Sequence, residues 1–306
     1  MNKTILLCLL GLLLTPAIPV FPAIAEEPMK LVILGTGTPL ADPDRSGPAL
    51  AIIKDNKSYL IDIGPGIVRR ASAAAKKHSI PSLEAHHLDA AFITHLHTDH
   101  TVGLPDLVFS PWVLGRPHPL KLYGPSGTKK MASHILQAYQ QDIDLRLNGL
   151  EPANPNGYKV ETSEITQGGI ILETESITVK AVPILHGSWK KAYGYAFSDG
   201  ETKIVISGDA RPSPNLVEAA KGADILVHEV YSTEKFEELP EQWQKYHASF
   251  HTSTHELADI AKQAKPKLLV LYHQLYWGAS DADLVREVRE AGYQGKVISA
   301  SDLDVY

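Results

Sequence analysis

The stretch THLHTDH, residues 94–100, indicates both the fold and the chemistry of this chain. It places His95, His97, Asp99 and His100 in one short turn, directly after the apolar run LDAAFI. Core packing does not favour so many titratable side chains in one turn, because each one needs a hydrogen-bond partner when it is buried. Imidazole and carboxylate groups are, in contrast, common ligands of metal ions. The stretch therefore predicts a metal-binding turn at the end of a strand.

Three further apolar runs each lead into a titratable residue. ITVKAVPIL, TKIVISG and KLLVLY are followed by His186, Asp209 and His273. In α/β folds the ends of strands bring side chains from distant parts of the chain to one crevice. Seven nitrogen and oxygen ligands could converge there, a number that suits two ions better than one. The alternative is that His186 and His273 are ordinary core residues and that the turn alone binds metal.

Apolar strands alternate with turns and amphipathic helices from Lys30 to the C-terminus, which predicts a mixed α/β fold. The predicted helix 253–264 begins with a capping box of Ser253 and Glu256. Residues 148–164 are polar and are interpreted as a loop or hairpin. We expect one domain over residues 26–306. Strands are predicted at 30–35, 58–64, 88–95, 177–186, 202–209, 223–229 and 267–273, and further helices at 68–78 and 213–220.

The first 25 residues have the features of a secretory signal peptide. The basic start MNK is followed by an apolar run broken by prolines, and AIA at residues 23–25 fits an A-x-A cleavage site. The alternative, an uncleaved membrane anchor, is disfavoured by the prolines and the small residues behind the run. We therefore expect a periplasmic or secreted protein that is cleaved after Ala25 and keeps no stable membrane anchor.

Composition limits the chemistry of the mature chain. The 306 residues are 44% hydrophobic and 21% charged, and the single cysteine, Cys8, lies within the expected signal. Without a thiol the mature chain has no disulfide and no cysteine nucleophile, so a metal must be held by imidazole and carboxylate. Loss of Lys3 with the signal makes the formal net charge of −6 one unit more negative. Such a chain repels a polyanion such as tRNA, and no long basic run is present to override this.

Taken in order, several motifs resemble the metallo-β-lactamase superfamily, in particular its ribonuclease Z-like and arylsulfatase-like branch. The resemblance covers most of the mature chain and implies an αββα sandwich with a dinuclear zinc site at one edge, with Mn²⁺ or Fe as alternative ions. The motifs are THLHTDHTVGLPDL (94–107), LGTGTP (34–39), YLIDIGPG (59–66), LYGPSGT (122–128), AYGYAF (192–197), SGDA (207–210), VHEV (227–230) and HTSTHELADIA (251–261).

The resemblance also implies a role for each ligand. One ion would be bound by His95, His97 and His186, the other by Asp99, His100 and His273, and both by the bridging Asp209. In addition to binding metal, Asp99 would orient or deprotonate the attacking water.

Two further residues are implied in leaving-group chemistry. His251 would protonate the leaving group with Glu229 as its partner, since a carboxylate raises the pKa of an imidazole and fixes its tautomer. An ordinary buried ion pair is the alternative for these two residues. Asp62 is expected to support the metal-binding turn without contacting a metal.

The chain departs from ribonuclease Z at the basic arm that grips tRNA. Many of these enzymes insert the arm between the strand that carries GY and the strand that leads to the bridging aspartate. Here a tight turn at Asp199 and Gly200 joins these two strands. Because the arm is missing and the chain is acidic, we expect no tRNA partner. The expected function is that of an exported zinc-dependent hydrolase of small anionic esters, either phosphodiesters or aryl sulfate esters, which uses a metal-bound hydroxide.

Other functions stay open. A lactone or β-lactam needs less help at its leaving group, so the expected pairing of His251 and Glu229 argues against these substrates. A non-catalytic periplasmic metal-binding protein would usually have lost ligands, whereas every expected position is filled. Homodimer formation is left open. Trp189, Lys190 and Lys191 either receive an anionic or aromatic substrate or form a solvated turn. Seven other histidines match no motif and are interpreted as surface or helix-end residues: His78, His86, His87, His118, His134, His247 and His255.

Overall fold

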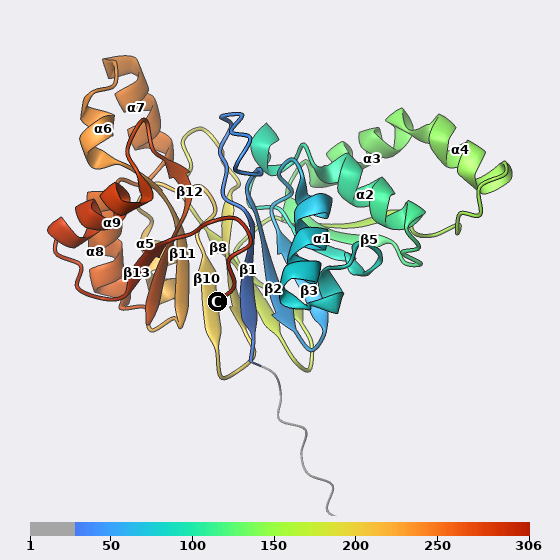
Figure 1. Cartoon of the computed structure of the whole chain (residues 1–306), viewed down its shortest axis with the longest axis horizontal. Coiled ribbons are helices and arrows are strands. Elements are labelled where there is room, and N and C mark those ends of the chain that lie inside the picture. Colours follow the sequence, from blue (N-terminus) through green and yellow to red (C-terminus); the bar gives the residue numbers. More distant parts are fainter. Residues whose placement is uncertain (1–27) are drawn as a thin grey trace, which may run out of the picture.

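The computed structural model describes residues 28–306, so the expected signal peptide, residues 1–25, lies outside the described part. Two β-sheets stack face to face, and helices cover the outer face of each sheet (Figure 1). The predicted αββα sandwich is therefore confirmed. Within the described residues, no helix has the length and apolar character needed to cross a membrane.

The first sheet has its strands in sequence order. Its first three strands are antiparallel neighbours, and the remaining strands run parallel to the third. The last helix of this half, α4, projects away from the sheets (Figure 1). The strands are β1 (Lys30–Gly35), β2 (Ala49–Lys54), β3 (Lys57–Ile61), β4 (Ala90–Phe92), β5 (Leu120–Pro125) and β6 (Val160–Ile165), and the helices are α1 (Ile67–His78), α2 (Leu104–Val113), α3 (Thr128–Ala138) and α4 (Gln140–Asn148).

The second sheet has the order β13-β12-β11-β10-β9-β8-β7. The strands from β10 to β13 are parallel, and those from β7 to β10 are antiparallel. Helices α6 and α7 extend beyond one end of this sheet (Figure 1). The strands are β7 (Gly169–Glu173), β8 (Thr178–Pro183), β9 (Tyr193–Ser198), β10 (Lys203–Ile206), β11 (Ile225–Tyr231), β12 (Leu268–Leu275) and β13 (Val297–Ser299), and the helices are α5 (Pro214–Ala220), α6 (Thr233–Glu237), α7 (Glu241–Phe250), α8 (Thr254–Ala264) and α9 (Asp281–Glu290).

Strand β1 shows how the layers are held together. Leu31 and Ile33 pack in the apolar core between the two sheets, whereas Val32 and Leu34 pack in the core beneath α1 and α2. Successive side chains of a strand point to opposite faces, so a run of buried apolar residues indicates a strand that is covered on both faces. A third core lies between the second sheet and helices α5, α8 and α9.

Most predicted elements are present, with ends that differ by a few residues. Helix α8 has the predicted capping box, because Ser253 and Glu256 each accept a hydrogen bond from the backbone N–H of the other. The prediction of a loop or hairpin for residues 148–164 is wrong in part, since Val160–Ile165 forms the edge strand β6 beside β5. This strand is mostly polar and half exposed, so it lacks an apolar signal.

The connection between β9 and β10 is the predicted tight turn. It spans residues 199–202, and the Asp199 carboxylate accepts hydrogen bonds from the backbone N–H groups of Glu201 and Thr202. Gly200 has φ +93°, a left-handed conformation that favours glycine. The second Asp199 oxygen lies 3.2 Å from Lys54 Nζ. The two strands are thus joined with no inserted arm.

Arg116 is fully buried behind α2 and ties several segments together. Its guanidinium donates hydrogen bonds to four backbone carbonyls at 2.7–3.0 Å. Burial lowers the pKa of Arg116 to about 10, which still leaves the group charged at neutral pH. The four carbonyls belong to Leu88, Leu107, Val108 and Gly157.

Candidate metal centre

The structure brings all seven expected ligands together at one end of the two sheets. Their side-chain atoms form two groups, and within each group the atoms lie within 4.8 Å of one another. Asp209 belongs to the first group and also approaches the second, since its Oδ2 lies 3.3 Å from His100 Nε2 and 3.7 Å from His273 Nε2. The first group is His95, His97, His186 and Asp209, and the second is Asp99, His100 and His273.

These residues reach the site from four parts of the chain. The loop after β4 carries the metal-binding turn, and residues 98–100 form a short 3₁₀ helix. His186 follows β8 and Asp209 follows β10, as the strand pattern predicted. His273 differs, because β12 continues past it to Leu275. The pairing of β11 with β12 shifts at this point, and His273 has φ +46°, so a β-bulge directs its side chain.

The outer nitrogens of three imidazoles are fixed by oxygen atoms. His95 Nδ1 lies 3.0 Å from the Thr94 hydroxyl, and His186 Nδ1 lies 2.9 Å from the carbonyl oxygen of Phe250. His100 Nδ1 lies 2.7 Å from the carboxylate of Asp62. A proton held on Nδ1 leaves the lone pair of Nε2 free for a metal, which is the usual arrangement around a metal-binding histidine.

The inner nitrogens and oxygens lack enough partners of their own. The Nε2 atoms of His95 and His186 lie 2.9 and 3.2 Å from the same atom, Nδ1 of His97. Each of these nitrogens carries at most one proton, so the close nitrogen pairs are poor hydrogen bonds. His100 Nε2 and Asp209 Oδ1 are buried without a hydrogen-bond partner. Such orphaned atoms are costly in a protein interior, and cations placed between them would satisfy them. The set of imidazole and carboxylate donors fits divalent ions of the zinc class.

The protonation states of the expected ligands follow from burial and from their neighbours. Burial raises the pKa of Asp209, but the His273 and His100 imidazoles outweigh it and hold that pKa well below its usual range. Burial lowers the pKa of His95 strongly and that of His186 to about 4, so both are neutral at pH 7. Burial also lowers the pKa of His100, but Asp209 and Asp62 outweigh it and raise that pKa well above its usual range. Ionised carboxylates and neutral imidazoles are the forms that bind metal, so His100 releases a proton when a metal binds.

Asp62 supports the metal-binding turn from outside both groups, as expected. One carboxylate oxygen accepts a hydrogen bond from the backbone N–H of Thr94 at 2.8 Å, and the other accepts from His100 Nδ1 at 2.7 Å. Asp62 has φ +60°, a conformation that is costly for most residues with a β-carbon. The turn is therefore held by a buried side chain that contacts a ligand and not the metal position itself.

His251 and Glu229 lie beside the centre. His251 Nδ1 is 3.3 Å from Glu229 Oε1 and 4.0 Å from Asp209 Oδ2. Glu229 Oε1 also accepts hydrogen bonds from the backbone N–H groups of Ala210 and Thr252, both at 3.1 Å. Burial and the nearby Asp209 raise the pKa of Glu229 well above its usual range.

The expected rise in the pKa of His251 is not observed. Burial lowers the pKa of His251 to about 4, since removal from water disfavours the charged imidazolium more than neighbouring carboxylates favour it. The contact with Glu229 is therefore present, and its predicted electrostatic effect is outweighed. The part that this pair plays in catalysis stays a prediction.

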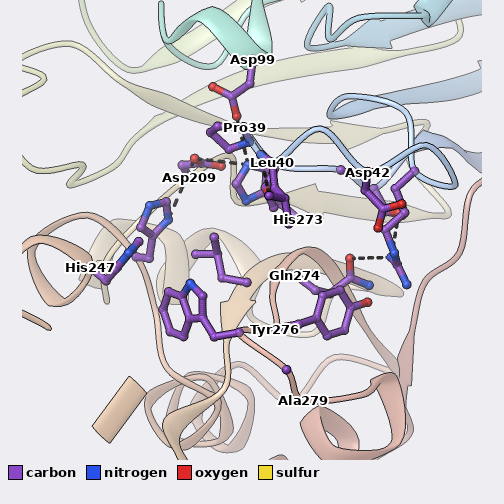
Figure 2. Close-up of a pocket in the computed structure, with 18 of the residues that line it drawn as sticks. Pro39, Leu40, Asp42, Asp99, Asp209, His247, His273, Gln274, Tyr276 and Ala279 are labelled. Atoms are coloured by element: carbon purple, nitrogen blue, oxygen red, sulfur yellow. Dashed lines mark hydrogen bonds and ion pairs between the residues drawn. The ribbon is translucent and has the colours of Figure 1, made fainter. Parts of the chain in front are cut away.

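A cavity of about 740 Å³ opens onto the centre, with Asp99, Asp209 and His273 in its wall (Figure 2). His247 lies half-exposed in the last turn of α7, as its interpretation as a surface or helix-end residue predicted, and it also lines this cavity. The spacing of aromatic residues along α7 was the signal in the sequence that could have identified this wall. The aromatic part of the cavity wall is formed by Trp243, Tyr246, His247, Tyr276 and Trp277.

In the segment after His186, the side chains of Trp189 and Lys191 contact other parts of the protein. The indole N–H of Trp189 donates a hydrogen bond to His97 Nε2 at 2.8 Å, so Trp189 packs against an expected ligand. Lys191 Nζ donates to the carbonyl oxygen of Thr166 at 2.6 Å on the exposed surface. These contacts give both side chains structural partners.

The αββα fold and the clustered histidines and aspartates define a class, the metal-dependent hydrolases built on this sandwich. The β-lactamase superfamily domain matches residues 57–274, and the chain belongs to this superfamily in its metallo-β-lactamase form. It is ribonuclease Z-like: ribonuclease Z of Mycobacterium marinum is 30% identical over 279 residues, which cover 90% of this chain and 97% of that protein.

Solved structures agree on the fold. The metallo-β-lactamase fold protein YhfI of Bacillus subtilis matches with a TM-score of 0.68 and 20% identity, over 92% of this chain and 99% of that one. The short form of human tRNase Z matches with a TM-score of 0.66 and 22% identity, over 90% and 98% of the two chains. The chain is thus a metal-dependent hydrolase that acts on ester bonds, and its family implies a divalent metal, typically zinc.

Proposed function

We propose that this protein is a phosphodiesterase for small anionic esters and that it holds two zinc-class ions. The observation that carries the proposal is the position of Asp209, which lies between two groups of expected ligands at the end of a cavity. Two bound ions would neutralise the charge of a phosphoryl group and lower the pKa of a water molecule. Mn²⁺ and Fe are the alternatives to zinc.

The other steps are assigned to side chains of the protein. Asp99 lines the cavity and orients the attacking water or accepts its proton. His251 also lines the cavity, and because its pKa of about 4 leaves it neutral at pH 7, it first takes up a proton from solvent and then donates it to the leaving oxygen. Glu229 Oε1 lies 3.3 Å from His251 Nδ1 and holds the imidazole in place, since the Glu229 carboxyl group is fixed by two backbone N–H groups. A sulfate ester presents a similar anionic centre, so aryl sulfates are the second substrate class to test.

A small ester is favoured over tRNA, although the curated relatives carry the name ribonuclease Z. The direct turn between β9 and β10 leaves no arm at that position to grip a long polyanion. In addition, the formal net charge of −6 disfavours nonspecific binding of nucleic acid. We also propose export, on the basis of the signal-like residues 1–25, and mass spectrometry that finds an intact Met1 in the cytoplasm would contradict it.

The substrate class is tested with purified protein on a panel of esters, with and without a chelator. We expect chelator-sensitive hydrolysis of bis(4-nitrophenyl) phosphate and no cleavage of precursor tRNA. Faster turnover of 4-nitrophenyl sulfate would assign the protein to aryl sulfates instead. Turnover of a chromogenic cephalosporin alone would exclude the proposal, and no turnover of any substrate by the metal-loaded protein would favour a metal-binding role.

A further inference from the structure

Helix α7 carries a continuous aromatic face, and three of its four side chains line the cavity. Trp243, Tyr246, His247 and Phe250 follow the spacing i, i+3, i+4 and i+7, which places them on one side of the helix. Ring centroids lie 5.8 Å apart for Trp243 and Tyr246 and 4.6 Å apart for Tyr246 and Phe250. Trp243 is 49% exposed and Tyr246 is 37% exposed. Core packing therefore does not account for the aromatic residues at the outer end of this face.

The aromatic face leads from the cavity rim to the metal centre. Phe250 packs with its ring centroid 5.0 Å from that of His186, and Gly187 leaves the space for it, because a β-carbon there would lie 2.1 Å from the Phe250 ring. His247 contacts Trp277 with centroids 4.6 Å apart, which extends the aromatic wall across the cavity. The helix ends at Phe250, and His251, the expected proton donor, follows as its C-cap residue.

The charges around the cavity disfavour a second anionic group on the substrate. Among the described residues that line it, Arg45 is the single lysine or arginine. Its guanidinium lies 3.2 Å from the Asp281 carboxylate and stands over the Tyr276 ring. Asp42 and Asp281 line the same cavity. A substrate with one anionic centre at the metal positions and an uncharged remainder therefore fits the charges best.

We propose that the aromatic face of α7, together with Trp277, is a subsite for an uncharged aromatic group on the leaving oxygen of a singly charged ester. This inference rests on the proposed function and names its substrate class. His251 follows α7 and gives a proton to the leaving oxygen, so the group bonded to that oxygen lies along the helix. Flat rings pack well against Trp and Tyr side chains.

The reaction balances with water as the co-reactant. The oxygen of water forms a new bond to phosphorus, and the bond from phosphorus to the aryl oxygen breaks. One proton of the water passes to Asp99 and the other stays on the phosphate, and a proton that His251 has taken up from solvent passes to the released aryl oxygen. The products are a phenol and a phosphomonoester. Asp99 and His251 then exchange protons with solvent.

The subsite is tested by calorimetric binding of phenylphosphonate and methylphosphonate to the zinc-loaded mature protein. We expect phenylphosphonate to bind about tenfold more tightly or better, because its ring leaves water on the aromatic face. Trp243→Ala and Tyr246→Ala should each reduce this preference severalfold and leave methylphosphonate binding unchanged. Gln242→Ala, at an exposed position of the same helix, is the matched control and should keep the preference.

The outcomes separate the subsite from the proposed function. Equal binding of the two phosphonates to the wild-type protein would overturn the subsite and leave the phosphodiesterase proposal standing. So would a phenyl preference that survives both alanine substitutions in folded, zinc-loaded variants. Failure of both phosphonates to bind the zinc-loaded protein would instead contradict the anion-binding metal centre itself, and the subsite with it.

Discussion

Replacing Asp62 separates the stability of the metal-binding turn from its affinity for metal. Asp62→Ala leaves two buried N–H donors, the Thr94 N–H and the His100 Nδ1–H, without their acceptor. It also removes the acceptor of the Thr94 hydroxyl, which can rotate toward another partner. Each unsatisfied donor costs about 1–3 kcal/mol, and alanine at φ +60° costs about 1 kcal/mol more. We therefore expect the free energy of unfolding of the metal-free protein to fall by about 3–7 kcal/mol.

Asp62→Asn acts differently, because its amide keeps the shape of the carboxylate. Asparagine tolerates the left-handed conformation, and its oxygen still accepts from Thr94. Its NH₂ group then faces His100 Nδ1, which becomes an acceptor, and the ring proton moves to Nε2. The lone pair that would bind metal is lost, so zinc affinity should fall by about 10–100-fold. The free energy of unfolding of the metal-free protein should change by only about 1 kcal/mol.

Urea unfolding of the metal-free proteins gives the first quantity, and competition with a chromophoric chelator gives the second. Asp55 supplies the matched control, since it also has a left-handed conformation, φ +49°, but lies in the exposed turn between β2 and β3. Asp55→Ala and Asp55→Asn should leave zinc affinity unchanged. Wild-type zinc affinity in Asp62→Asn, or a loss of stability as large as in Asp62→Ala, would refute the reasoning.

Four further substitutions test other parts of the site and fold. Asp209→Ala should lower the metal content of both positions, and elemental analysis that finds one position still full would contradict a bridging role. His251→Ala should keep its metal but slow the hydrolysis of esters with poor leaving groups by about 10²–10⁴-fold, with a much smaller loss for 4-nitrophenyl esters and a weaker version of this pattern in Glu229→Gln. Equal losses on both substrate types would remove His251 as the acid. Arg116→Ala should lower the free energy of unfolding by about 3–5 kcal/mol, measured by urea titration at fixed zinc, and normal stability would show that its four carbonyls find other partners.

The sequence predicted the parts of the site that carry their own chemical signal. The histidine turn and the strand ends before His186 and Asp209 could be located, because apolar runs and titratable residues contrast sharply. The bulge that directs His273 could not be predicted, since it depends on the pairing of β11 with β12. Strand β6 was missed because an edge strand needs few apolar residues.

The surroundings of His247 and His251 could not be predicted from local sequence patterns. His247 had no recognised motif, and its place beside the centre depends on where α7 docks after the sheet is formed. The pKa of His251 was likewise predicted to rise from its partner's charge alone, whereas burial, a property of the whole fold, dominates. Local patterns therefore identified the groups, and tertiary packing determined their surroundings.

We propose that the two groups of ligands around Asp209 hold two zinc-class ions that hydrolysis requires. Elemental analysis of the purified protein at saturating zinc, paired with hydrolysis of bis(4-nitrophenyl) phosphate on the same samples, tests it most directly. We expect two ions per chain and a loss of hydrolysis that follows their removal by a chelator. One ion or fewer at saturating zinc, or hydrolysis that persists in the metal-free protein, would contradict it.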